Sequence, residues 1–229
     1  MNRLVIVVFV CGMMIISSEL KAQNVVQKIE PVNFSQVEIQ DNFWKPIINK
    51  VSTVTIPVCI EQTEVKTPRI RNYEKVVANK GEKHEGIYFD DSDVYKALEA
   101  IAYSLKNHPD AALEKKADEW IDKIAAAQQP DGYLNTYYTL SGLEKRWTDP
   151  HMHEDYCAGH LIEAAVAYYN TTGKRKLLDV AIRFADHIDQ TFRQNNMPWV
   201  SGHQEIELAL VKLYHATGNI RYLDLADWY

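Results

Sequence analysis

The chain has 229 residues, of which 46% are hydrophobic, 24% charged and 10% aromatic, with nine glycines and eight prolines. This composition is that of a globular protein and excludes collagen-like, low-complexity and largely disordered chains. Thirty-one acidic against twenty-five basic residues give a formal net charge of -6, which argues against nucleic acid or an anionic membrane surface as the partner.

The first 22 residues have the features of a secretion signal. An apolar run from Leu4 to Ile16 follows Arg3, and small residues precede a cleavage site after Ala22. The run has about 13 residues, fewer than the roughly 20 needed to cross a bilayer, which disfavours a membrane anchor. We therefore expect cleavage of residues 1–22, a mature chain 23–229 without an integral membrane segment, and export to the periplasm or the cell exterior.

Two cysteines, Cys59 and Cys157, remain in the mature chain. In an oxidising compartment they can pair, but a chain with a sizeable core has little need of a disulfide, and buried free thiols are the alternative. The sequence leaves both states open.

Apolar residues recur every three to four positions from Ser92 onward, which predicts a succession of helices. The predicted helices cover residues 92–107, 110–129, 158–169, 174–193 and 205–214, and a last one begins at Asn219. The helices at 110–129 and 174–193 are amphipathic, whereas the helix at 158–169 is apolar on nearly all sides. Buried and amphipathic helices therefore alternate along the chain.

An internal repeat accompanies this alternation. An offset of 45 residues aligns Tyr169 with Tyr214 and gives the shared signature Y-x-x-T-G-x-x-x-x-L-D-x-A. Gly173 and Gly218, within this signature, are predicted to cap the buried helices in the left-handed conformation. A weaker copy lies at an offset of 64, and its additional residues fall in the loop 130–150, which contains a Pro-Asp-Gly turn and several aromatic residues.

Repeated helical hairpins of this length build two architectures. An open solenoid would serve as a non-catalytic module that binds protein or glycan. A closed (α/α)6 toroid has buried inner helices, amphipathic outer helices and long loops at one rim. The contrast between the helices and the placement of the long loops favour the toroid. We therefore predict an all-α fold, a partial (α/α)6 toroid of helical hairpins that makes up about half of the ring.

Polar and aromatic residues concentrate in the loops that precede the buried helices. Aromatic faces beside carboxylates and imidazoles suit a sugar, whose C–H faces stack on rings and whose hydroxyl groups need donors and acceptors. The residues predicted at this rim are Glu85, Tyr88, Asp90, Asp91, Asp93, His151, His153, Glu154, Asp155, Tyr156, Trp199, His203 and Glu205.

Several residues also have a purely structural interpretation. Ser92 and the aspartates beside it can cap a helix, His160 can be a core histidine, and Cys157 can be a packing residue rather than a nucleophile. The segment 151–155 contains two histidines and two acids. No second ligand pair at zinc-site spacing accompanies it, so we predict no metal site there.

Four long motifs resemble one family of enzymes. They are FDDSDVYKALEAIAYSL (89–105), QQPDGYLNTYY (128–138), HEDYCAGHLIEAAVAYYNTTGKRKLLDVAIRFADHID (153–189) and GHQEIELALVKLYHATGNIRYLDLA (202–226). In this order they closely resemble the bacterial beta-L-arabinofuranosidase family of glycoside hydrolases. The resemblance implies an (α/α)6 toroid followed by β-sandwich domains, and retaining hydrolysis of non-reducing-end L-arabinofuranosides or related plant-glycan sugars.

The same resemblance implies a mechanism that differs from the usual pair of carboxylates. A zinc-bound cysteine thiolate is the nucleophile, and a glutamate is the general acid and base. Neither these residues nor the Cys and Glu zinc ligands have a counterpart among residues 1–229, and Cys157 matches the family's Y-C-A-G-H helix instead. The residues that carry over are two sugar-contacting histidines, His153 and His203. Asp155 stands where the family usually has an apolar residue.

The repeat predicts that the chain ends inside a helix, because Tyr229 aligns with Phe184. A six-hairpin ring needs roughly 300 residues at about 45–60 residues per hairpin. We therefore expect an amino-terminal portion of a longer enzyme, able by itself to hold part of a sugar site but not to catalyse hydrolysis.

Overall fold

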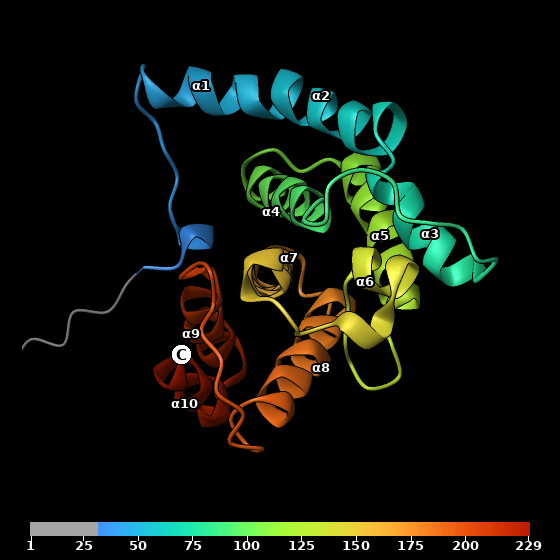
Figure 1. Ribbon diagram of the computed structural model, residues 1–229. Helices are drawn as coiled ribbons and strands as arrows, with labels where there is room; N and C mark the ends of the chain where they lie inside the picture. The colour runs from blue at the N-terminus through green and yellow to red at the C-terminus, as the bar shows by residue number, and fades with distance from the viewer. Residues whose placement is uncertain (1–31) are drawn as a thin grey trace, which may run out of the picture. The chain divides into compact units, whose positions relative to one another are not determined.

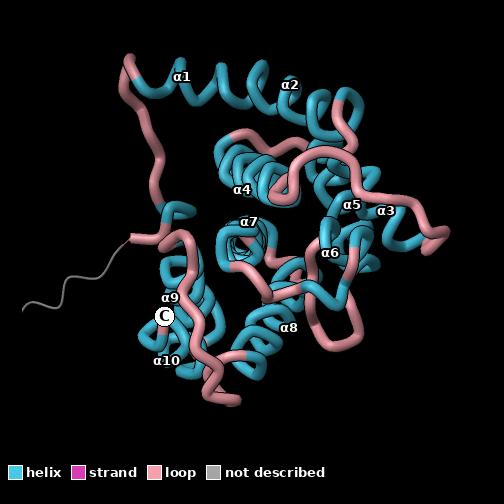
Figure 2. Tube along the Cα trace, viewed as in Figure 1, coloured by secondary structure: helices cyan, strands magenta, loops and turns pink. Residues whose placement is uncertain are grey.

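Helices make up the regular structure of this protein. The computed structural model describes residues 32–229, so the expected signal, residues 1–22, lies outside the described residues. Residues 34–229 fold as one unit in which helices are joined by loops, and no strand occurs among the described residues (Figure 1, Figure 2). The prediction of an all-α fold is confirmed.

The helices follow one another through loops of unequal length. In chain order they are η1 (Phe34–Gln36), α1 (Trp44–Lys50), η2 (Val51–Thr55), α2 (Ile56–Ile60), η3 (Glu61–Lys66), α3 (Arg69–Ala78), α4 (Asp91–Asn107), α5 (Ala111–Ala127), α6 (Thr136–Ser141), η4 (Leu143–Lys145), η5 (Pro150–Met152), α7 (Glu154–Thr172), α8 (Lys176–Thr191), α9 (Glu205–Thr217) and α10 (Ile220–Trp228). Within the described part of the chain, no helix is both long and apolar enough to cross a membrane.

Two layers of helices alternate along the chain. The inner layer consists of α4, α7 and α9, with α7 packed against both of the others (Figure 1). The outer helices α3, α5 and α8 pack in the same order, α3 on α5 and α5 on α8. α7 is buried on most sides because its side chains are mainly small and apolar, whereas α8 buries one face, including Leu177 and Phe184.

The repeated glycines end the inner helices as the sequence predicts. Gly173 and Gly218 adopt φ values of 73° and 71°. Their N–H groups donate to the carbonyl oxygens of Tyr169 and Tyr214, at 2.8 and 2.7 Å, so both repeated positions take part in the cap.

Hydrophobic periodicity predicts no helix before Ser92, yet residues 44–66 form one nearly continuous helix. Pro57 has no N–H to donate to the carbonyl group of Thr53, and the turn around Val51–Thr55 is widened to a π-helix. β-branched residues are frequent in this stretch, which weakens a prediction of helix from sequence.

The close approach of α9 to α7 depends on Gly159. A Cβ atom at this position would lie 2.6 Å from Cγ of Glu205 and 3.0 Å from its carbonyl carbon and oxygen. The missing side chain therefore lets the first residue of α9 rest on α7. This contact places the loop before α9 beside the start of α7.

Candidate functional site

His153 and His203 come together at the beginnings of two inner helices. His153 directly precedes α7, and His203 lies in the loop before α9. Their ring centroids are 4.7 Å apart, and the two Nε2 atoms are 3.0 Å apart. His153 is half-buried and His203 is exposed, so a ligand can reach this histidine pair.

The hydrogen bonds of the histidine pair indicate which ring nitrogens carry protons. Nδ1 of His153 lies 2.6 Å from the carbonyl oxygen of His151, and because a carbonyl only accepts, Nδ1 carries the proton. Nε2 of a neutral His153 is then an acceptor, and Nε2 of His203 donates to it. With both rings neutral, Nδ1 of His203 carries no proton and can accept a hydrogen bond from a hydroxyl group.

Aromatic rings surround His153 on several sides. The ring centroids of Tyr88, Phe89 and Tyr156 lie 5.3, 5.2 and 5.4 Å from that of His153. Tyr88 and Phe89 come from the loop before α4, so three loop regions contribute to the site. Half-buried aromatic rings beside imidazoles provide both stacking surface and hydrogen-bonding groups.

The backbone of His153 is left-handed, with φ 62° and ψ 27°. This region is uncommon for residues other than glycine and is kept only where neighbouring contacts fix it. On one side, the carbonyl oxygen of His153 accepts from the N–H of Cys157 at 3.0 Å. On the other, the next residue, Glu154, is held by the loop 130–150.

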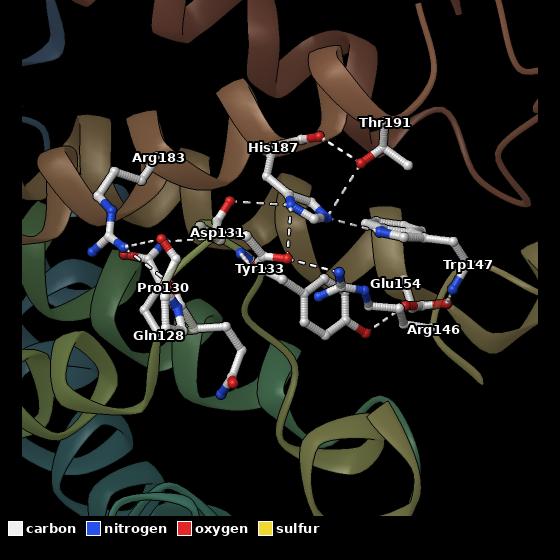
Figure 3. Close-up of polar contacts among 12 residues, drawn as sticks. Gln128, Pro130, Asp131, Tyr133, Arg146, Trp147, Glu154, Arg183, His187 and Thr191 are labelled. Atoms are coloured by element: carbon white, nitrogen blue, oxygen red, sulfur yellow. Dashed lines mark hydrogen bonds and ion pairs between the residues drawn. The ribbon is translucent and has the colours of Figure 1, made fainter. Parts of the chain in front are cut away.

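The Glu154 carboxyl group is buried and accepts two hydrogen bonds from that loop. The donors are the Tyr133 hydroxyl group and the Trp147 backbone N–H, the latter at 2.8 Å (Figure 3). Burial raises the pKa of Glu154 to about 7, and the neighbouring Asp155 adds to this shift. Glu154, predicted at the polar rim, therefore anchors the loop 130–150.

The same loop is attached to the outer helix α8 through His187. Trp147 Nε1 donates to His187 Nε2 at 3.0 Å, and His187 Nδ1 lies 3.2 Å from the carbonyl oxygen of Asp131 (Figure 3). Both ring nitrogens of a neutral imidazole are thereby satisfied, and burial lowers the pKa of His187. Gln128 adds a second attachment, because its amide donates to the carbonyl oxygens of Gly132 and Val180.

A cleft of about 620 Å³ lies between this loop and α8. Its charged groups are already paired: Arg146 with Asp131 at 2.7 Å, and Arg183 with the carbonyl oxygens of Gln129 and Pro130 at 3.1 and 3.3 Å. Apart from His187, no aromatic ring lines it. The cleft therefore offers a sugar less than the histidine pair does.

Asp155, the departure from the family pattern, has a structural partner. Its buried carboxylate accepts a hydrogen bond from Nε1 of Trp199 at 2.8 Å. Trp199 in turn stacks on Phe192, with ring centroids 4.8 Å apart. Asp155 therefore ties the loop before α9 to α7, which helps to hold His203 near His153.

Asp90 and Asp91, at the start of α4, do not act as simple helix caps. Helix α4 begins at Asp91, whose carboxylate accepts from the backbone N–H and hydroxyl group of Thr136 at 2.7 and 2.6 Å. Burial raises the pKa of Asp91 to about 6. Asp90 accepts from the N–H of Ile87 and pairs with Arg69. These carboxylates cross-link α3, α4 and α6 rather than face a ligand.

Cys157 is a buried packing residue, as the structural interpretation predicts. Burial raises the pKa of its thiol well above the usual value, which disfavours a nucleophilic thiolate. Cys59 is also a free thiol, so the two cysteines do not form a disulfide.

His160, predicted as a core histidine, faces carboxylates instead of an apolar core. Its Nδ1 lies 3.1 Å from Oε1 of Glu205. Burial lowers the pKa of His160 to about 4, and burial together with the nearby Glu163 raises that of Glu205. The ligand atoms of these three residues lie within 4.8 Å of one another, closely enough to be considered for a metal.

One carboxylate of this group already has a cationic partner, because the ammonium of Lys212 pairs with Glu163. The group contains no cysteine, so it does not fit the Cys and Glu zinc site that the family resemblance implies. The segment 151–155 forms no metal-binding group in the described structure either. We therefore derive no catalytic step through zinc from this chain.

Comparisons with known proteins place these features in one family. The profile described as "Beta-L-arabinofuranosidase, GH127 catalytic domain" matches residues 36–229. A non-reducing end beta-L-arabinofuranosidase of Bifidobacterium longum subsp. longum is 41% identical over 182 residues, which are 75% of this chain and 27% of that relative.

Solved structures also show the similarity of this chain to the GH127 family. A GH127 beta-L-arabinofuranosidase from Geobacillus stearothermophilus T6 superposes with a TM-score of 0.80 at 46% identity, over 84% of this chain and 32% of that one. A second GH127 beta-arabinofuranosidase superposes with a TM-score of 0.80 at 42% identity, over 87% of this chain and 33% of that one. The all-helical fold is thus that of the GH127 helical-toroid enzymes. The chain belongs to the GH127 beta-L-arabinofuranosidase family and spans about a third of these relatives.

Proposed function

We propose that this chain supplies the sugar-contacting inner helices of a beta-L-arabinofuranosidase that acts, with retention, on non-reducing-end L-arabinofuranosides or related plant-glycan sugars. The observation that carries the proposal is the His153–His203 pair, with its Nε2 atoms 3.0 Å apart, at the starts of α7 and α9. Family membership supports the carbohydrate class of the ligand. We also propose export, on the strength of residues 1–22.

The hydrogen-bonding state of the pair fits a polyhydroxylated ligand. The unprotonated Nδ1 of His203 can accept from a sugar hydroxyl group, and the surrounding rings of Tyr88 and Tyr156 can stack on its C–H faces.

Bond cleavage requires groups that these helices do not provide. The family resemblance assigns bond cleavage to a zinc-bound cysteine and a glutamate, which have no counterparts among residues 1–229. The Cys157 thiol is buried and its pKa is raised, which disfavours it as the nucleophile. We propose that zinc serves the family's reaction through Cys and Glu ligands that have no counterpart among residues 1–229, and that residues 32–229 contribute sugar binding and orientation.

Titration of the chain with methyl β-L-arabinofuranoside, followed by the NMR signals of the histidine rings, tests this proposal. We expect His203→Ala to weaken binding about five- to tenfold, the loss of one hydrogen bond to a neutral group, and His153→Ala to have a similar effect because His203 loses the acceptor that orients its ring. His215→Ala, an exposed histidine of α9, is the matched control and is expected to leave binding unchanged. Equal affinity in all three variants would remove the histidine pair from the site.

A further inference from the structure

The ring of Tyr156 is in contact with three imidazoles. Its centroid lies 5.4 Å from that of His153, 5.0 Å from that of His203 and 4.4 Å from that of His160. Tyr156 is the third residue of α7, so it belongs to a rigid inner helix, whereas His153 and His203 belong to connecting segments. The orientation of this one ring therefore limits the positions that both histidines of the pair can take.

Lys96 on the neighbouring helix α4 fixes that ring. Its Nζ donates to the Tyr156 hydroxyl group at 2.5 Å and lies 4.7 Å from the centroid of the same ring. The other polar neighbours of Nζ are more distant, Ser92 Oγ at 3.5 Å and an Asp93 carboxylate oxygen at 4.0 Å. The hydroxyl group of Tyr156 is thus the principal partner of this ammonium.

We infer that Lys96 is a positioning residue of the sugar site, acting through the Tyr156 hydroxyl group to hold the His153–His203 pair in its hydrogen-bonded arrangement. The inference rests on the proposed function for the identity of the ligand. The positioning itself does not depend on the ligand, because Lys96, Tyr156 and the two histidines all belong to this chain. It makes a lysine that touches neither histidine a determinant of sugar affinity.

Two physical features make this assignment specific. α4 and α7 are tightly packed inner helices, so the Lys96–Tyr156 bond joins two elements that move little relative to each other. A charged donor also gives a stronger hydrogen bond than a neutral one, so the Lys96–Tyr156 bond restrains the hydroxyl group more than a neutral donor would. Removal of the Lys96 ammonium or of the Tyr156 hydroxyl group leaves the aromatic ring of residue 156 free to change its side-chain torsion angle. The packing around the ring is kept.

A double-mutant cycle with Lys96→Met and Tyr156→Phe tests the inference. We expect each single variant to weaken binding of methyl β-L-arabinofuranoside about three- to tenfold, and the double variant to weaken it no further than either single one, because both remove the same bond. Lys96→Arg, whose guanidinium can still donate to the hydroxyl group, is expected to recover most of the affinity. Lys106→Met, in the last turn of α4, is the matched control.

The second readout does not depend on the sugar. In ¹H–¹⁵N spectra of the histidine rings, we expect Nδ1–H of His153 and Nε2–H of His203 in the unsubstituted chain, and loss of this single tautomer pattern in Lys96→Met and Tyr156→Phe. Affinity losses that add in the double variant would show that Lys96 acts on its own and would overturn the inference. Unaltered ring spectra in both single variants would overturn it too. Absence of sugar binding with altered spectra would refute the proposed function alone.

Discussion

The Glu154 carboxyl group shows how a residue predicted at the polar rim can serve the site indirectly. It is buried beneath the loop 130–150 and holds Tyr133 and Trp147, and thereby fixes the chain next to His153. Its pKa of about 7 in the folded protein lies above the usual 4.5. The folded state therefore holds this proton more tightly than the unfolded state.

The consequence is a stability that depends on pH in a definite direction. The contribution of this proton is complete below about pH 4.5 and is lost as pH rises through about 7. We expect the unfolding free energy of the unsubstituted chain to fall between pH 5 and pH 8 by on the order of 2 kcal/mol more than that of Glu154→Gln. Urea unfolding of both proteins across this range measures the difference.

The Glu154→Gln variant also controls for the hydrogen bonds that the side chain of residue 154 makes with Tyr133 and Trp147. Its amide can accept from the Trp147 N–H and donate to the Tyr133 hydroxyl oxygen, so only the ionisation is removed. Asp91 and Glu205, whose pKa values are also raised, are present in both proteins, and their effects cancel. Parallel stability curves for the two proteins would contradict the assignment of the buried proton to Glu154.

Sequence reasoning found some residues of the site and missed others for physical reasons. His153 and His203 were identified by resemblance, and the structure places them in contact. Lys96 was missed, because a lysine on a helix usually extends into solvent. The Trp147–His187 contact was missed as well, since nothing local in the sequence pairs residues 40 positions apart.

At the scale of elements, hydrophobic periodicity predicts the helices after Ser92, but it places the start of one buried helix several residues too far along the chain. The predicted start of the buried helix at residue 158 is wrong, because α7 begins at Glu154. Two acidic residues there suggest a solvated loop, yet both are buried against partners from distant loops. Such tertiary pairing is not encoded in local periodicity, and it decides where the helix begins.

The close approach of α9 to α7 predicts whether the substitution Gly159→Ala raises or lowers the unfolding free energy. Replacement of glycine by alanine inside a helix normally stabilises by about 1 kcal/mol. At Gly159 we expect the opposite, a loss of about 1–3 kcal/mol in unfolding free energy, because the new methyl group overlaps Glu205. Urea denaturation of Gly159→Ala measures it.

A second substitution separates the two parts of this overlap. Glu205→Ala in the Gly159→Ala background removes the Cγ contact but not the 3.0 Å contacts with the backbone of residue 205, so we expect only part of the stability to return. Unchanged or increased stability in Gly159→Ala would show that α9 does not rest on α7 in this way.

At the scale of the whole molecule, the alternation of inner and outer helices explains why the site forms where it does. Each inner helix begins after a long loop, and the loops before α4, α7 and α9 meet around His153. The outer helix α8 contributes by anchoring one of these loops through His187. The repeat in the sequence predicted the alternation, whereas the anchoring contacts required the structure.

We propose the histidine pair as the sugar site of this chain. A crystal structure of the chain with methyl β-L-arabinofuranoside tests it most directly. We expect the sugar to contact His153 and His203, with a ring face against Tyr88 or Tyr156. A sugar bound only in the cleft between the loop 130–150 and α8, with none at the histidine pair, would contradict the claim.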